Sequence, residues 1–337
     1  MEERVSFNKS ITSKDVARVA GVSQSTVSRV FNKSDAYGVK EEVREKVLQA
    51  AKEIGYSPNL VARGMISGKT NVIGLVVGDS LGPFYNRIVN EFVEKIQGIG
   101  KQCLVFKVPR QEQLRNITER VIQFQVEAVV ITASAMTKVM AEAIVGNDIP
   151  VVLFNRFIPG VNINTVYVDP VEGAGMVAEH LAKKKHTNIG YIQFTKETGE
   201  EQEKKIGFYS KLRQYGVNQI QEETSGYNYQ EGYDAGLRLL KGNNPPTAIF
   251  CTSDLIAMGV MDAARIELGL RVPEDVAVVG YDDIEMASWK AYQLTTIHQP
   301  VEEMISESIA MLERMVDGDK MPYVKMIKPE LIERKSV

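Results

Sequence analysis

Beyond residue 71, short apolar runs alternate with segments of helical periodicity. The runs are VIGLVVG, QCLVFKV, AVVIT, PVVLFN, IGYIQF, TAIFCT and VAVVGYD. Uninterrupted apolar strands between amphipathic helices are typical of parallel sheets that helices cover on both faces. The runs outnumber the strands that one open sheet of this length needs, and a long stretch separates PVVLFN from IGYIQF. We therefore expect an α/β body of two lobes.

The N-terminal part has a different pattern, in which short helical segments follow one another without strands. Thr12 and Asp15 form a start signal like a capping box, with Asp in place of the usual Glu. Gly21 accepts the left-handed backbone that ends a helix, and Ser23 can cap a second helix about three residues later. The residues expected on the inner faces are Val16, Val19, Ala20, Val27 and Val30.

A third helix is expected from apolar residues spaced by three or four, which are Val39, Val43, Val47, Ala50 and Ile54. Gly55 ends it. Two short helices joined by a tight turn that contains glycine are typical of a helix-turn-helix. Any small helical hairpin is the alternative reading of this pattern.

The outward positions of the second helix favour DNA binding over a merely solvated face. They are Gln24, Ser25, Thr26, Ser28 and Arg29, and no acidic residue lies among them. Gln can bond adenine and Arg can bond guanine, while Ser and Thr can hold phosphates. A solvated helix face would more often mix Glu with Lys.

The distribution of charge supports the same interpretation. The whole chain has a formal net charge of -3, but residues 1–70 carry 12 Lys and Arg against 8 Asp and Glu. A basic N-terminal segment on an acidic body is expected to attract the phosphates of a nucleic acid.

Between the helices and the body lies a short segment that begins at Tyr56. Ser57 is expected to cap a helix and Pro58 to start it. A helix this short is marginal alone, since isolated helices need roughly 12–15 residues. The expected organisation is a helix-turn-helix domain at 1–56, a hinge helix and linker at 57–70, and a two-lobed domain for effector binding and dimerisation at 71–337.

Three stretches together resemble the LacI/GalR family of bacterial transcription regulators. They are KDVARVAGVSQSTVSRVFN, EKVLQAAKEIGYSPNLVARGM and VIGLVV, and the likeness continues through nearly the whole chain. The resemblance implies a small all-α helix-turn-helix head on an α/β two-lobed body of the type I periplasmic-binding-protein kind, with parallel sheets. It also implies a homodimer that binds a pseudo-palindromic operator in double-stranded DNA, in most cases as a repressor.

In that family the second helix enters the major groove and paired hinge helices enter the minor groove. By position, Gln24, Ser25 and Arg29 would read bases, and Met65 would replace the usual Leu as a wedge between base pairs. The full set of DNA-binding candidates is Thr12, Ser23, Gln24, Ser25, Thr26, Ser28, Arg29, Asn32, Asn59, Ala62, Arg63 and Met65. Val43 in place of a usual Thr, and a loop about two residues longer before the third helix, depart from the family pattern.

The resemblance also implies a small-molecule effector, such as a sugar or a sugar derivative, in the cleft where the strands end. The candidate residues follow from position and are Phe84, Tyr85, Asn155, Arg156, Asp169, Lys204, Tyr227, Ser253, Asp254 and Asp282. Two alternatives stay open, namely that Phe84 and Tyr85 are core residues and that Asp254 caps the next helix. Lys204 stands where sugar-binding members have Arg, so the effector is an unusual sugar or another compound.

Catalysis is not expected, and neither are a cofactor or a bound metal. Ser80 lies in a G-x-S-x-G motif after a strand, which is the remote alternative of a hydrolase. None of His180, His186 and His298 follows an Asp by three residues, as the late histidine of such esterases does. We expect His180 and His186 to be exposed at a Lys-rich helix end.

No apolar run approaches the ~18 residues of a membrane span, and the N-terminus has no apolar signal stretch. With only Cys103 and Cys251, the sequence favours a reducing cytoplasm. A regulator whose body responds to a protein partner in place of a small molecule is the main alternative function.

Overall fold

The computed structural model describes residues 11–31, 38–57, 70–78, 82–108, 114–132, 149–158, 160–195, 199–319 and 321–337. It divides into two compact units, Met1–Thr70 and Asn71–Val337. The hinge candidates Asn59, Ala62, Arg63 and Met65, together with Asn32 and Ser80, lie outside the described residues.

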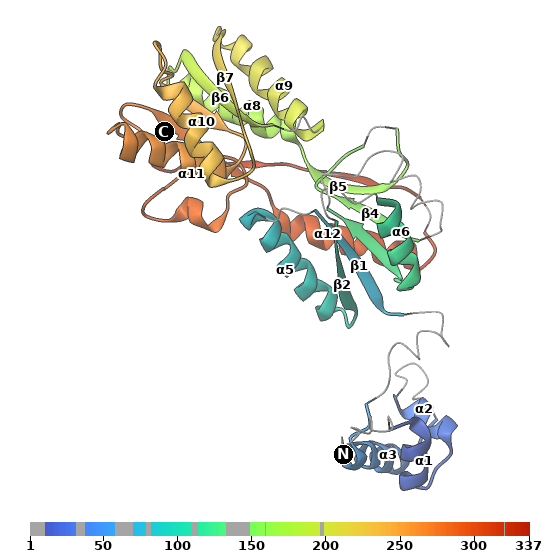
Figure 1. Ribbon diagram of the computed structural model, residues 1–337. Helices are drawn as coiled ribbons and strands as arrows, with labels where there is room; N and C mark the ends of the chain where they lie inside the picture. Colours follow the sequence, from blue (N-terminus) through green and yellow to red (C-terminus); the bar gives the residue numbers. More distant parts are fainter. Residues whose placement is uncertain are drawn as a thin grey trace. The chain divides into compact units, whose positions relative to one another are not determined.

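The first unit contains α1 (Ser13–Ala20), α2 (Gln24–Phe31) and α3 (Glu41–Ile54) (Figure 1). The capping box of Thr12 and Asp15 is present, and Gly21 takes a φ of 67° at the end of α1, as predicted. Val16, Val27 and Val47, one from each helix, are completely buried against one another. Phe31 and Tyr56 add an edge-to-face contact with ring centroids 5.6 Å apart.

Two predictions about these helices are wrong. Val19 is 46% exposed, because the inner face of α1 is centred on Val16 and Ala17. The third helix begins at Glu41, with Lys40 as its N-cap, so Val39 precedes the helix although it still packs against the core of this unit.

The first lobe of the body is a parallel sheet in the order β11-β5-β4-β3-β1-β2. Its strands are β1 (Val72–Val77), β2 (Gln102–Lys107), β3 (Ala128–Ile131), β4 (Val151–Phe154), β5 (Asn164–Val168) and β11 (Val324–Ile327). On one face pack α5 (Pro83–Gly98) and α12 (Val301–Val316), and on the other packs α6 (Leu114–Gln123). Both faces are therefore covered, as continuous apolar strands require.

The second lobe is a parallel sheet in the order β7-β6-β8-β9. Its strands are β6 (Asn188–Phe194), β7 (Gln219–Ser225), β8 (Ala248–Cys251) and β9 (Ala277–Val279). One face is covered by α8 (Pro170–Lys183) and α9 (Gly199–Gln214), and the other by α10 (Tyr229–Leu240) and α11 (Asp254–Asp262). Short helical turns follow at η1 (Ala263–Glu267) and η2 (Glu285–Ser288).

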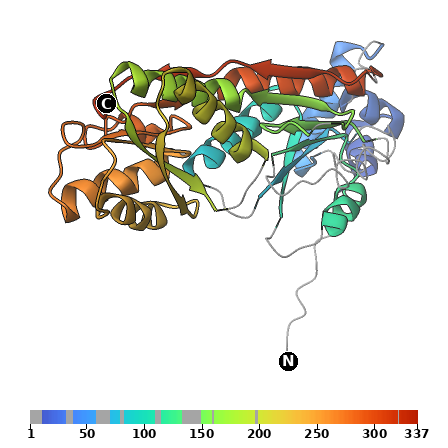
Figure 2. The same ribbon diagram turned by 90° about the horizontal axis from the view of Figure 1, so that it is seen from above.

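Three segments carry the chain between the lobes, and Figure 2 shows the two lobes side by side. The first runs from β5 into α8, and the second from β10 (Thr296–His298) into α12. The third runs from β11 into β12 (Glu330–Ile332), which pairs with β10 in antiparallel fashion. The predicted α/β body of two lobes is confirmed, and LTTIHQP is one of its crossovers. Among the described residues, no helix is long and apolar enough to cross a membrane.

Candidate DNA-binding and effector sites

The predicted recognition face of α2 is exposed and faces away from the core of the first unit. Gln24, Ser25, Ser28 and Arg29 are exposed, while Val27 and Val30 on the opposite face are buried. The helical period places these polar residues along one side. The part of the helix that could contact DNA therefore presents hydroxyl, amide and guanidinium groups and no carboxylate.

Ser23 and Thr26 hold the N-terminal turn of α2 in place. The Oγ of Ser23 accepts a hydrogen bond from the backbone N–H of Thr26 at 3.1 Å, which is the predicted capping contact. The amide of Gln24 donates to the hydroxyl of Ser13 on α1 at 3.0 Å. This contact joins the starts of the two helices and gives Gln24 a partner within the protein.

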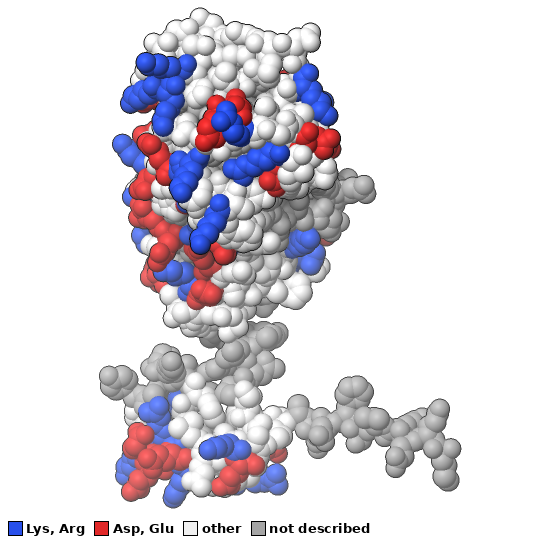
Figure 3. Space-filling model, turned by 90° about the vertical axis from the view of Figure 1, so that its left-hand side faces the viewer, with Lys and Arg blue, Asp and Glu red and all other residues white. Residues whose placement is uncertain are grey.

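The described residues of the first unit show no uniformly basic surface on the face that Figure 3 draws. On the face drawn in Figure 3, acidic and basic side chains lie side by side in both units. The case for DNA binding thus rests on the side chains of α2 and not on the general charge of the unit.

In the body, Asp282 lies at the carboxyl end of the second lobe's sheet and is almost completely buried. Its Oδ2 accepts a hydrogen bond from the hydroxyl of Tyr227 at 3.0 Å, and its Oδ1 accepts one from the amide of Gln299 at 2.9 Å. Burial raises the pKa of Asp282 to about 7, although Lys204 lowers it. Tyr227 approaches the first lobe, because a Cβ on Gly82 would lie 3.2 Å from its ring.

Lys204 is buried and its ammonium is already paired. Its Nζ lies 2.9 Å from Glu200 and 3.4 Å from Glu201, both on the preceding turn of α9, and 4.2 Å from the ring centre of Tyr281. Burial alone would lower the pKa of Lys204, but the two carboxylates outweigh it and raise the pKa. Lys204 therefore keeps its positive charge although it is buried, and this charge acts on Asp282.

A small cavity lies between the first lobe and α9. Its lining combines aromatic, amide and charged side chains, namely Tyr85, Thr132, Asn155, Arg156, Phe157, Tyr167, Glu200 and Glu203, with Val168, Pro170 and Gly199. Burial lowers the pKa of Arg156 below its ordinary value, and the carboxylate of Glu200 offsets only part of this effect. The structure brings together here Tyr85, on the first turn of α5, and Asn155 and Arg156, which follow β4.

Phe84 and Asp169 have structural roles in the described chain. Phe84 is 3% exposed and packs in the core with its neighbours on α5, which is the alternative left open for it. The carboxylate of Asp169 accepts hydrogen bonds from the backbone N–H groups of Val171 and Glu172, so Asp169 caps α8.

Ser253 and Asp254 also bind within the protein. Ser253 is the N-cap of α11, so the suggestion that Asp254 caps this helix is wrong. Asp254 is fully buried, with Oδ2 accepting from the backbone N–H of Ile284 at 2.9 Å and Oδ1 accepting from the hydroxyl of Thr296 at 2.5 Å. The oxygens of Asp254 thus bind the turn after β9 and strand β10.

Several residues of this region were not found from the sequence. Glu200 and Glu201 stand four and three residues before Lys204, a spacing that places them on its helix face and could have revealed the pairs. Gln299 and Asp283 carry no such signal, because Gln299 meets Asp282, and Asp283 meets His298 and Arg334, only through the fold.

Of the three histidines, His180 is buried, so its predicted exposure is wrong. It lies on α8 under the second lobe's sheet, with its Nδ1 3.7 Å from Glu333. In the part of the chain that the structure describes, no cluster of three or more His, Cys, Asp or Glu could hold a metal ion.

The fold and the recognition face define a helix-turn-helix transcription regulator with a periplasmic-binding-protein-like body. Residues 12–59 match the model of bacterial regulatory proteins of the lacI family, and residues 178–337 match a periplasmic binding protein-like domain. The chain is 33% identical over 337 residues to the HTH-type transcriptional repressor PurR of Haemophilus influenzae, covering 97% of this chain and 98% of that protein. It is 31% identical over 330 residues to the HTH-type transcriptional regulator DegA of Bacillus subtilis, covering 96% of each.

Comparison with solved structures leads to the same class of protein. The lac repressor dimer bound to operator and the anti-inducer ONPF is 26% identical, with a TM-score of 0.88 over 97% of this chain and 99% of that one. The transcriptional regulator CelR in complex with cellobiose is 27% identical, with a TM-score of 0.72 over 97% of this chain and 100% of that one. The chain belongs to the LacI family of bacterial regulatory proteins. It is a transcription regulator and not an enzyme, so the hydrolase alternative with Ser80 is set aside.

Proposed function

We propose that this protein acts in the cytoplasm as a dimeric repressor that binds a pseudo-palindromic operator and changes its affinity when a small molecule enters the inter-lobe cleft. The observation that carries the DNA-binding part is the exposed face of α2, which bears Gln24, Ser25, Ser28 and Arg29 without an acidic residue. Residues 57–70 would supply the hinge helix, with Met65 as the wedge.

Four relatives support the proposal. The lac repressor was solved as a dimer on its operator with an anti-inducer, and CelR was solved with cellobiose. The relatives named PurR and DegA regulate transcription. We propose that the effector is sugar-like and that Asp282 lies at the centre of its binding site. A buried acid near the end of a strand can accept hydrogen bonds from neighbouring hydroxyl groups of a sugar.

The DNA-binding part is tested by Arg29→Ala. The substitution should weaken operator binding by about 1–3 kcal/mol and relax one base position in each half-site, because Arg pairs with guanine through two hydrogen bonds. Affinity for the operator and for single-base variants would be measured by fluorescence anisotropy at fixed salt. Arg44→Ala on α3, whose exposed ion pair to Glu41 is 3.8 Å long, is the control. An equal loss on operator and random DNA would assign Arg29 to phosphate contact.

The effector part is tested by a thermal-shift screen of neutral sugars, sugar phosphates and nucleobases against the wild type and Asp282→Ala. A compound bound in the cleft should raise the melting temperature of the wild type and not that of the variant. It should also change operator affinity by roughly 5–150-fold in the wild type alone. If no compound binds and a protein partner changes operator affinity, the body responds to that partner and the effector proposal fails.

A further inference from the structure

The turn that carries Asp282 has an unusual backbone. Asp282 has a φ of 114° and Asp283 a φ of 50°, so two consecutive residues with side chains occupy the left-handed region. Such conformations are uncommon outside glycine and persist only where the surroundings hold them. We call residues 281–284, which follow β9, the Asp282 turn.

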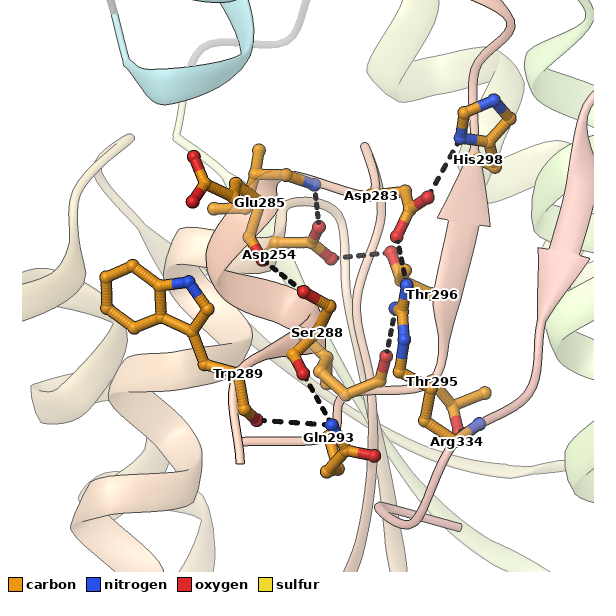
Figure 4. Close-up of polar contacts among 12 residues, drawn as sticks. Asp254, Asp283, Glu285, Ser288, Trp289, Gln293, Thr295, Thr296, His298 and Arg334 are labelled. Carbon is orange, nitrogen blue, oxygen red and sulfur yellow. Dashed lines mark hydrogen bonds and ion pairs between the residues drawn. The ribbon is translucent and has the colours of Figure 1, made fainter. Parts of the chain in front are cut away.

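The carboxylate of Asp283 is clamped between two basic side chains. Its Oδ2 accepts a hydrogen bond from Nδ1 of His298 at 2.9 Å, and its Oδ1 accepts one from Nη2 of Arg334 at 2.7 Å (Figure 4). The side chains of Asp283 and Arg334 are each only 16% exposed. Burial alone would raise the pKa of Asp283, but the two hydrogen bonds hold it below its ordinary value, so Asp283 stays ionised.

Arg334 is itself fixed at several points. Its Nη1 donates to the backbone carbonyl of Leu294 at 2.7 Å, and its backbone N–H donates to the hydroxyl of Thr295 at 2.9 Å. A guanidinium held in this way presents a rigid pair of donors. Arg334 therefore sets the position of Asp283 and does not merely follow it.

The same turn is tied to the segments that connect the lobes. His298 ends β10, and Arg334 stands two residues beyond β12, which is the antiparallel partner of β10. The backbone N–H of Asp282 donates to the carbonyl of Ile297 in β10 at 2.9 Å. The clamp on Asp283 thus draws one basic side chain from each of two of the three crossover segments.

We propose that His298 and Arg334 are positioning residues of the effector site. By holding Asp283, they maintain the left-handed turn that sets the position of the Asp282 carboxylate, and they connect that carboxylate to two of the three crossover segments. This inference rests on the proposed function, in which Asp282 contacts the effector. Neither residue touches the effector in this scheme.

Hydrogen exchange of the full-length protein, without any added compound, tests the clamp. In Arg334→Gln, the backbone amides of Asp282 and Ile284 should exchange at least about tenfold faster, because the turn opens locally. The amide of Thr252, which bonds β6 in the same lobe, should be unchanged. Arg334→Lys should restore part of the protection, since Lys keeps the charge but has no planar fork.

Arg271→Gln is the matched control, because Arg271 also grips an Asp, Asp275, with two hydrogen bonds in the same lobe. It should leave the amides of Asp282 and Ile284 unchanged. The proposal is overturned if Arg334→Gln leaves those two amides as in Arg271→Gln. It is also overturned if Arg334→Gln accelerates Thr252 by the same factor, which would make the role of Arg334 one of general stability.

A second measurement repeats the thermal-shift panel of neutral sugars, sugar phosphates and nucleobases on Arg334→Gln. Any compound that requires Asp282 should bind the variant with at least a threefold higher Kd. A compound that requires Asp282 but binds Arg334→Gln as tightly as the wild type contradicts the role proposed for the clamp. The proposed function is not affected by that result. Faster exchange at Asp282 with no compound in the panel binding the wild type supports the clamp and counts against the proposed effector.

Discussion

Asp282 is buried and ionisable, so the stability of the folded protein should depend on pH. Burial raises the pKa of Asp282 to about 7, whereas an Asp in an unfolded chain titrates near about 3.9. Between these values the folded protein holds a proton that the unfolded chain has lost. Stability therefore falls as the pH rises through this window.

Asp282→Asn should remove this fall, because Asn does not ionise. Relative to the wild type, the free energy of unfolding of the variant should be greater at pH 8 than at pH 5 by on the order of 2–3 kcal/mol, given roughly 1.4 kcal/mol per pKa unit. Urea denaturation at both pH values measures it. Asp275→Asn is the control, since Arg271 lowers the pKa of Asp275 to about 2 and no step is expected in this range. An equal shift at both pH values would contradict the argument.

At this scale the sequence locates side chains better than it assigns their roles. Asn155, Asp254 and Asp282 all follow buried strands, as their positions indicate. What the sequence does not show is which backbone N–H groups come near in space. Asp254 receives the N–H of Ile284, thirty residues away, and so binds inside the protein and not into the cleft.

Among the elements, the contact between α8 and α9 is close enough to require a glycine. A Cβ on Gly207 would lie 2.2 Å from the backbone oxygen of Val171, which has no room to move. Gly207→Ala should therefore force the helices apart and destabilise the body by about 1–3 kcal/mol. Thermal unfolding followed by circular dichroism measures the loss.

Gly199→Ala is the control for this substitution. Gly199 is the first residue of α9, and a Cβ there would meet nothing within 4 Å. Equal melting temperatures for the two variants would show that α8 and α9 adjust without cost.

The elements that the sequence reveals are those with continuous apolar runs. The seven runs correspond to β1, β2, β3, β4, β6, β8 and β9. Five of these strands are interior and buried on both faces, whereas β2 and β9 lie at sheet edges. β7 (QIQEETS) and β11 (VKMI) escaped detection, since Gln, Glu or Lys interrupts their apolar residues. β5 (NTVYV) also lies outside the seven runs, although it is an interior strand. β2 is also a partly exposed edge strand, but its consecutive Leu104, Val105 and Phe106 gave a signal, so the composition of a strand decides whether the sequence reveals it.

The whole molecule consists of units with separate cores. Val16, Val27 and Val47 belong to a buried cluster whose described members all lie in the first unit. We expect a fragment of residues 71–337 to unfold within about 2–4 °C of the body in the intact protein, the shift that roughly 1 kcal/mol produces in a chain of this size. Calorimetry of both proteins tests this. A much lower melting temperature of the fragment would mean that the first unit supports the body.

The discontinuity of the first lobe has a consequence for the order of events during synthesis. β11 pairs with β5, so the sheet of this lobe is incomplete until Ile327 has left the ribosome, whereas α3, the last described helix of the first unit, ends at Ile54. At about 5–20 residues per second, roughly 270 residues take on the order of 10–60 s to translate. For that interval the growing chain carries a finished recognition helix and an unfinished cleft. A nascent chain could therefore meet DNA before it is able to respond to an effector.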